Sequence, residues 1–248
     1  MQLLLIEQVS KRFGETVALD SVSVGFEAGQ IHAVLGENGS GKSTIVKLLS
    51  GILPGDSGRM VIDGQGFGGS GPAACRRLGI GTVFQEVLVA PDRSVVDNVL
   101  LGLDGPLRWA QPRATRRDRA AAVLDEIGAG SLPLGVAVGS LTLAEQQMVV
   151  IARALAGNPR VLILDESTAA LDHGDRDAVF AAVARRAAAG CAVIMISHRM
   201  DEVLGLSHAI SVLRGGKLVR TVPRAEATAK LLLELTAPER QIPMALAI

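Results

Sequence analysis

The sequence has no net charge and very little cysteine. Its 25 lysine and arginine residues are matched by 25 aspartate and glutamate residues, so the formal net charge at neutral pH is zero. Proteins that bind nucleic acid generally carry a basic excess, and this balance argues against that class. The two cysteines, Cys75 and Cys191, lie far apart, in no metal-binding or redox spacing. We therefore predict two ordinary thiols in a reducing cytosol.

No run of residues is apolar enough to span a bilayer, although 48% of the sequence is hydrophobic. The longest uncharged stretch, 127–144, contains four glycines and a proline, which predicts a loop and the start of a helix. The chain opens without the basic and apolar segments of a signal peptide, and we expect none. A length of 248 residues fits one domain, or one domain with an inserted lobe.

Short apolar runs alternate with helical patterns along most of the chain. The runs predict strands at 3–9, 18–26, 30–35, 55–63, 80–84, 161–164, 192–196, 209–213 and 217–222. Buried strands that alternate with helices predict a mainly parallel α/β sheet. A glycine-rich segment, 64–71, predicts a mobile loop. Residues from about 88 to 156 have helical patterns, and we expect a helical subdomain there, inserted into a single domain that spans 1–248.

A second glycine-rich segment, residues 36–43, follows the strand expected at 30–35 and leads into a helix expected at 42–50. It matches the phosphate-binding pattern G-x-x-x-x-G-K-[ST]. The glycines let backbone N–H groups surround phosphate oxygens, and the positive end of the helix points at the same anion. We expect Lys42 to reach the β- and γ-phosphates and Ser43 to bind Mg²⁺. The predicted nucleotide contacts here are Gly36, Asn38, Gly39, Ser40, Gly41, Lys42, Ser43 and the adjacent Thr44.

Two carboxylates end the apolar strand expected at 161–164. Asp165 and Glu166 fall at the carboxyl end of a strand, where α/β sheets place ligands. Asp165 fits a role at Mg²⁺, through water, and Glu166 fits the general base that polarises the attacking water. An apolar run followed by Asp-Glu is a weak signal alone, and the phosphate-binding segment is what favours the catalytic interpretation.

Four further segments resemble, in the expected order, those of ATP-binding cassette (ABC) ATPases. Phe13 resembles the aromatic side chain that stacks on adenine, and Gln85 resembles the Q-loop glutamine, which senses Mg²⁺ and the γ-phosphate. His198 resembles the switch histidine that contacts the γ-phosphate. Asp172, in Ala169-Ala170-Leu171-Asp172, resembles the D-loop, which crosses the dimer interface. The resemblance covers residues 3 to about 235.

The resemblance implies both a fold and a set of roles. The fold is that of a P-loop NTPase with a mainly parallel core sheet, an antiparallel β subdomain and a helical subdomain. The implied catalytic residues are Lys42, Gln85, Glu166 and His198. The implied Mg²⁺ ligands are Ser43, Gln85 and Asp165. Phe13, Thr142 and Asp172 join the nucleotide contacts.

The family's signature segment, Leu-Ser-Gly-Gly-Gln, corresponds here to Leu141-Thr142-Leu143-Ala144-Glu145. Thr142 keeps a hydroxyl that can donate to a γ-phosphate at a helix N-terminus. Both glycines are absent, and Glu145 replaces a neutral amide. Its charge can repel the nucleotide of a partner cassette, which would weaken that site. Alternatively, Glu145 caps its own helix.

Three segments, 146–155, 165–171 and 197–203, resemble the ATPases of ribose- and galactose-type sugar importers. In that subfamily two cassettes are usually fused in one chain, whereas this sequence has one phosphate-binding segment and a tail, 237–248, that offers no second. We expect a stand-alone cassette, one half of a split pair, or part of a longer chain.

The resemblance implies an ATPase that drives the import of a sugar or similar solute. ATP and Mg²⁺ are the implied cofactors. The implied partners are a second cassette, identical or different, membrane permease subunits and, indirectly, a solute-binding protein, without nucleic acid. The implied location is the cytoplasmic face of the inner membrane. Two alternatives remain: a soluble ABC ATPase outside transport, and a regulatory cassette that hydrolyses ATP weakly.

Overall fold

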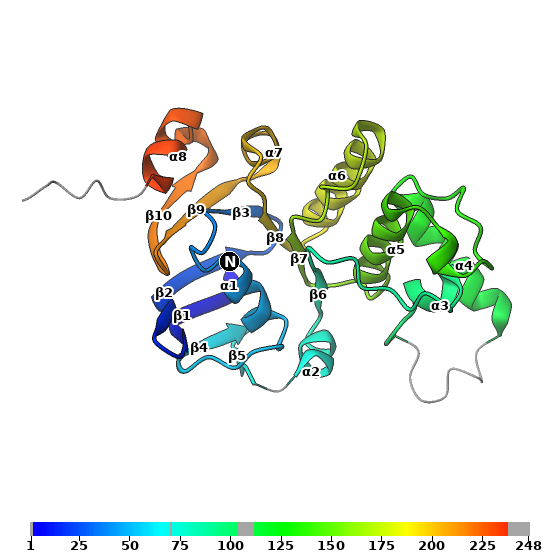
Figure 1. Ribbon diagram of the computed structural model, residues 1–248, viewed down its shortest axis with the longest axis horizontal. Helices are drawn as coiled ribbons and strands as arrows, with labels where there is room; N and C mark the ends of the chain where they lie inside the picture. The colour runs from blue at the N-terminus through cyan, green and yellow to red at the C-terminus, as the bar shows by residue number, and fades with distance from the viewer. Residues whose placement is uncertain (1, 70, 104–111, 238–248) are drawn as a thin grey trace, which may run out of the picture.

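A computed structural model describes residues 2–69, 71–103 and 112–237 (Figure 1). A six-stranded sheet has the order β10-β9-β3-β8-β7-β6, in which all neighbours are parallel except β10 and β9. Its strands are β3 (Ile31–Leu35), β6 (Ile80–Val83), β7 (Val161–Asp165), β8 (Ala192–Ile196), β9 (Ala209–Arg214) and β10 (Lys217–Pro223). All residues of β3, β7 and β8 are buried, as expected for strands that are covered on both faces.

A second, antiparallel sheet has the order β2-β1-β4-β5. It is formed by β1 (Gln2–Phe13), β2 (Thr16–Glu27), β4 (Ser57–Ile62) and β5 (Gln65–Phe67). Helix α1 (Lys42–Leu49) shares a buried apolar cluster with this sheet and with alternate residues of β7 and β8. Side chains alternate between the faces of a strand. One face of the parallel sheet therefore packs on α1 and the antiparallel sheet.

The other face of the parallel sheet is covered by α6 (His173–Ala188), α7 (Met200–Leu206) and α8 (Ala229–Thr236). Between β6 and β7 the chain forms α3 (Val95–Val99), α4 (Arg113–Glu126), η2 (Val138–Ser140) and α5 (Leu143–Ala156), which lie together at one end of the molecule (Figure 1). Their apolar side chains join the same cluster as α6. The division into a core and an inserted subdomain at about 88–156 stays a prediction.

Several elements differ from the expectations. The glycine-rich segment 64–71 is not all loop, because β5 pairs with β4 there, with Phe67 opposite Met60. Two short helices were not expected, α2 (Pro72–Arg77) and α7. The sequence also predicts a last helix near 225–235, but α8 begins only at Ala229, after a 3-10 turn, η3 (Arg224–Glu226), because the Thr228 side chain caps it. In the described part of the chain, none of the helices is both long and apolar enough to cross a membrane.

Candidate active site

The phosphate-binding segment forms the loop between β3 and α1, as its sequence predicted. Gly39 and Gly41 have φ angles of 80° and 106°, which side chains other than glycine rarely adopt. A Cβ at Gly41 would lie 2.6 Å from the Ala18 carbonyl oxygen. Glycine at this position is therefore needed both for backbone conformation and for space, directly before the first turn of α1.

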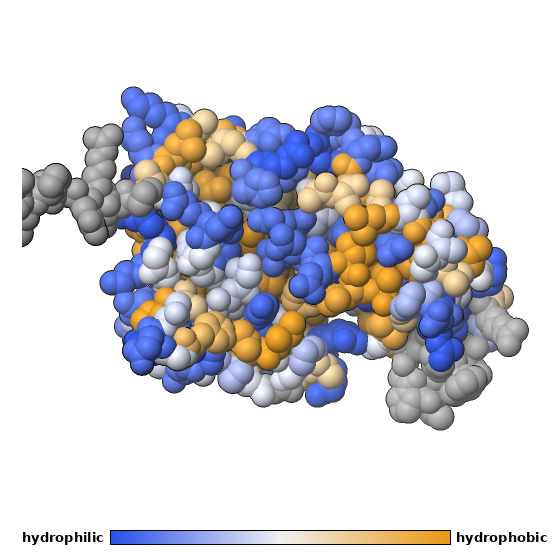
Figure 2. All heavy atoms as spheres, viewed as in Figure 1, coloured by the Kyte–Doolittle hydropathy of each residue, from blue (hydrophilic) through white to orange (hydrophobic). Residues whose placement is uncertain are grey.

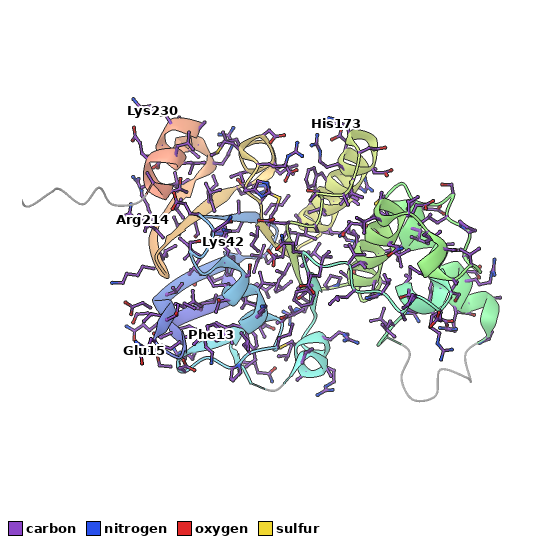
Figure 3. The ribbon with its side chains drawn as sticks, in the orientation of Figure 1. Phe13, Glu15, Lys42, His173, Arg214 and Lys230 are labelled. Carbon is purple, nitrogen blue, oxygen red and sulfur yellow. The ribbon has the colours of Figure 1, made fainter. Side chains whose placement is uncertain are left out.

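Lys42 lies buried at the start of α1, between the two sheets (Figure 3). Its Nζ donates to the carbonyl oxygens of Gly36, at 2.7 Å, and Glu37, at 2.9 Å. Burial lowers the pKa of Lys42, while the charges of Glu166 and Asp165 oppose that shift. The ammonium is thus held within the loop that was predicted to bind phosphate.

Asp165 and Glu166 follow at the end of β7. Asp165 is buried, and desolvation, followed by the charge of Glu166, raises its pKa to about 6. Glu166 has a φ of 45°, and its N–H donates to the carbonyl oxygen of Ile196 at 3.0 Å. A non-glycine residue in this conformation is strained and persists where its surroundings hold it. The bond to β8 supplies that restraint.

The Glu166 carboxylate lies between the side chains of two other sequence-predicted residues. Gln85 Nε2 donates to Glu166 Oε2 at 3.3 Å. His198 Nδ1 lies 3.3 Å from Glu166 Oε1. The three residues follow β6, β7 and β8, which are adjacent and parallel, so their carboxyl ends meet at one edge of the sheet. The fold therefore brings together Gln85, Asp165, Glu166 and His198, beside Lys42.

Phe13 lies apart from this cluster, at the end of β1 in the antiparallel sheet, and is 48% exposed (Figure 3). Lys11 Nζ is 5.7 Å from the centre of its ring, within the range of a cation–π contact. Asp56 accepts from Lys11 Nζ and from the Arg12 N–H, both at 2.7 Å. The contact between Lys11 and Asp56 was not predicted, because residues 45 positions apart in sequence give no local signal.

Thr142 and Glu145 form a capping box at the N-terminus of α5. Glu145 Oε2 accepts from the Thr142 N–H and from its hydroxyl, both at 2.8 Å, and Thr142 Oγ1 accepts from the Glu145 N–H at 3.3 Å. This is the capping arrangement that the sequence left open for Glu145. Asp172 likewise caps α6, where its Oδ1 accepts from the Asp175 N–H at 2.9 Å. The roles of Thr142 and Asp172 toward a nucleotide stay predictions.

The oxygen donors at the loop fit Mg²⁺ held together with a nucleotide. No group of three or more His, Cys, Asp or Glu side chains in the described residues is arranged to hold a metal ion alone. Mg²⁺ typically takes one or two protein oxygens and completes its shell with phosphates and water. Ser43 and Asp165 offer a hydroxyl and a carboxylate. Within the described residues, the buried Ser40 hydroxyl also lacks a hydrogen-bond partner, which suits a loop built around a ligand.

The fold and this loop define a P-loop nucleotide-binding protein. The sequence family described as ABC transporter matches residues 19–169. The ribose import ATP-binding protein RbsA 1 of Rhizobium etli is 41% identical over 93% of this chain and 45% of its own length. The ribose import ATP-binding protein RbsA of Yersinia pestis is 38% identical, over 98% of this chain and 49% of its own. The chain belongs to the ABC transporter family, and it spans about half the length of these curated relatives.

Solved ATP-binding cassettes of ABC transporters have the same fold. A nucleotide-free cassette matches with a TM-score of 0.83 and 26% identity, covering 96% of this chain and 100% of the other. A cassette in its ADP conformation matches with a TM-score of 0.81 and 27% identity, over 95% and 98%. A dimeric cassette in a post-hydrolysis state, bound to ADP and Pi, matches with a TM-score of 0.81 and 26% identity, over 89% and 98%. The predicted ABC ATPase fold is confirmed.

Proposed function

We propose that this chain is the ATP-hydrolysing, nucleotide-binding subunit of an ABC transporter that imports a sugar. The observation that carries the proposal is the Glu166 carboxylate, 3.3 Å from both the Gln85 amide and the His198 ring, beside the loop that holds Lys42. The names of the ribose import relatives support a sugar as the imported solute. The dimeric cassette of known structure supports association with a second cassette.

Both sheets contribute residues to the proposed nucleotide-binding site: the parallel sheet carries the phosphate-binding loop after β3, and the antiparallel sheet carries Phe13 at the end of β1. The loop of Gly36, Asn38, Gly39, Ser40 and Gly41 surrounds the phosphates, whose charge the Lys42 ammonium balances. Ser43 and Thr44, at the start of α1, complete that end of the site. Phe13 supplies an apolar ring for the adenine base.

Hydrolysis requires a water that is oriented and partly deprotonated. When bound, Mg²⁺ neutralises phosphate charge, and Ser43, Asp165 and Gln85 are the residues that would hold it. Glu166 accepts the proton of the attacking water, and general-base catalysis of this kind contributes about 10²–10⁴ in rate. Gln85 and His198 each face one oxygen of that carboxylate, so the two side chains fix its orientation.

A groove beside Gln85 is the proposed contact with the permease. It has a volume of about 260 Å³ and lies between β6, α2 and α5. Figure 2 shows apolar side chains gathered over α5 on the visible face. The exposed side chains of Ile52, Leu88 and Leu101 line the groove, and Leu88 belongs to the segment 86–98 that follows Gln85. We place the protein at the cytoplasmic face of the membrane, bound peripherally through this groove, with a solute-binding protein acting on the other side.

The test is phosphate release by the purified chain with ATP and Mg²⁺, alone and with a second cassette and permease subunits. We expect hydrolysis that depends on Mg²⁺ and is stimulated by the partners. Import by the assembled transporter is then measured with a panel of radiolabelled sugars against amino acids. Hydrolysis without any response to the partners would point to an ABC ATPase outside transport.

A further inference from the structure

A buried carboxylate contacts residues that neighbour the proposed catalytic residues in sequence. Glu202, in α7, is only 5% exposed. Its Oε2 accepts from the Ser197 hydroxyl at 2.6 Å, and its Oε1 accepts from the Thr168 hydroxyl at 3.2 Å. Arg199 Nε lies 3.2 Å from the same Oε1. Burial of a carboxylate is costly unless it is hydrogen-bonded and paired, and here both oxygens are engaged.

The partners of Glu202 lie on two loops that carry different proposed catalytic residues. Thr168 is two residues beyond Glu166, in the loop between β7 and α6. Ser197 directly precedes His198, in the loop between β8 and α7. The strands themselves are joined as far as the pair Asp165 and Ile196. Beyond that point, Glu202 links the two loops through side chains.

Ser197 is held on both sides. Its hydroxyl donates to Glu202 and accepts from the Arg199 N–H at 3.1 Å. The backbone is thus fastened directly before and directly after His198. The His198 ring itself is largely exposed, and its contact with Glu166 is long, at 3.3 Å, so its position depends on the backbone that carries it.

We propose that Glu202 is a positioning residue that holds His198 and Glu166 at contact distance by tying Ser197 to Thr168. The inference rests on the proposed ATPase function and adds to it a residue that does not touch the nucleotide. Misplacement of a catalytic group by about 1 Å costs on the order of 10² in rate. Removal of Glu202 should therefore lower turnover while leaving the phosphate loop and Phe13 intact.

The kinetic test compares Glu202→Ala and Glu202→Gln with the wild type, each also in a His198→Ala background. We expect Glu202→Ala to lower kcat about 10²-fold, with little change in KM for ATP. Glu202→Gln keeps an acceptor oxygen and should recover part of that loss. In the His198→Ala background the same change should lower kcat by clearly less, because the part of its effect that acts through His198 is already lost. An equal loss in both backgrounds would show that Glu202 does not act through His198, which would overturn the inference.

The matched control is Glu126→Ala, which removes a second ion-paired glutamate, one that is partly buried. Glu126 binds Arg186 at 2.6 Å, between α4 and α6, away from both loops. We expect this variant to lose thermal stability without a selective loss of kcat. A Glu126→Ala variant that reproduced the kinetics of Glu202→Ala would overturn the inference.

A second measurement is independent of hydrolysis. The imidazole NMR signals of His198, assigned with His198→Ala, should shift in folded Glu202→Ala and stay in place in Glu126→Ala. The signals of His32, buried in β3 with its Nε2 2.8 Å from Ser211 Oγ, serve as an internal reference. Unchanged His198 signals in Glu202→Ala would overturn the inference. A wild-type chain without any ATPase activity would contradict the proposed function, and the NMR signals would still decide whether Glu202 positions His198.

Discussion

Lys42 is the residue on which phosphate binding is expected to depend most. Its ammonium is bound to two carbonyl oxygens of its own loop. Phosphate oxygens are charged and accept stronger hydrogen bonds than carbonyls, so we expect the ammonium to turn to the nucleotide. Lys42→Ala should weaken ATP binding roughly 10- to 100-fold, as expected for one charge-assisted bond, and abolish hydrolysis. Calorimetric titration and phosphate release measure both. Turnover near the wild-type rate would contradict the assignment of this loop.

His32 provides a test of stability outside the active site. It is buried in β3, its Nε2 lies 2.8 Å from Ser211 Oγ, and burial lowers its pKa from 6.5 to about 4. Between these values the unfolded chain binds the proton and the folded chain does not. His32 therefore contributes stability that is complete above pH 6.5 and declines as the pH falls toward 4. We expect its contribution to fall by about 2 kcal/mol between pH 7 and pH 5.

The contribution of His32 must be measured as a difference in stability between the wild type and a His32 variant, because Asp165 changes stability in the opposite direction over the same pH range. Its pKa is raised to about 6, so its protonation favours the folded state as the pH falls through the same window. Urea unfolding of the wild type and of His32→Gln at both pH values isolates the histidine. Glutamine retains a hydrogen-bonding group toward Ser211. The prediction is wrong if the two proteins lose the same stability between pH 7 and pH 5.

Helix α5 shows how one element can serve stability and function at once. The Glu145 carboxylate caps the helix, and the Thr142 hydroxyl already donates to it. If a partner cassette presents a γ-phosphate here, the two anions compete for that hydroxyl. Glu145→Gln keeps an acceptor oxygen for the cap and removes the charge. We expect ATPase activity of the dimer to rise several-fold, by relief of like-charge repulsion of about 1 kcal/mol, with little change in melting temperature.

The control for α5 is Thr142→Ala, which removes the cap itself. Loss of such a cap costs about 1 kcal/mol of stability, so this variant should melt at a lower temperature and gain no activity. Steady-state ATPase assays and thermal melting compare the two. Unchanged or reduced activity in Glu145→Gln would mean that the carboxylate only caps the helix.

The elements that sequence predicted well are those with a continuous physical signal. Strands β7 and β8 contain apolar runs of four and five residues, and their predicted ends agree with the structure to within one residue. Helix α7 was missed because its seven residues are too few for helical periodicity to show. In the site, the sequence predicted the phosphate-binding loop around Lys42 and the carboxylate pair, Asp165 and Glu166, at the end of β7. The links from Glu202 to Thr168 and from Lys11 to Asp56 were not predicted, because each joins residues more than 30 positions apart.

At the scale of the whole molecule, we expect two cassettes to close around bound ATP before it is hydrolysed. The signature helix α5 lies in the helical part of the chain, remote in Figure 1 from the loop that precedes α1. We therefore expect the binding site of a nucleotide on that loop to be completed by α5 of a second cassette. Glu166→Gln keeps the shape of the side chain and removes the base, so ATP should bind and the closed pair should persist. We expect a monomer-to-dimer shift in gel filtration with ATP and Mg²⁺. A variant that stays monomeric both alone and with a second cassette would contradict this mechanism.

Coupling to the permease is expected at the groove beside Gln85. Leu88 lines this groove and is 54% exposed, while its carbonyl oxygen accepts from Arg153 Nη1 of α5 at 2.7 Å. The backbone is thus anchored independently of the side chain, and Leu88→Asp should fold normally. A charge buried in an apolar contact of this kind costs about 2 kcal/mol, which corresponds to roughly 30-fold weaker association.

The expected result for Leu88→Asp is basal ATPase activity that no longer responds to permease subunits, together with a loss of import into proteoliposomes. Leu233→Asp is the matched control, because Leu233 is 60% exposed on α8 and does not line the groove. That variant should remain fully coupled. If both variants couple like the wild type and melt at its temperature, the permease binds elsewhere. If both lose coupling, the effect is one of surface charge and not of the groove. If only Leu88→Asp loses its response to the permease subunits, the groove beside Gln85 is the site of coupling. Leu88 lies three residues from Gln85, whose side chain contacts Glu166, so a permease bound there is close in sequence to the catalytic residues.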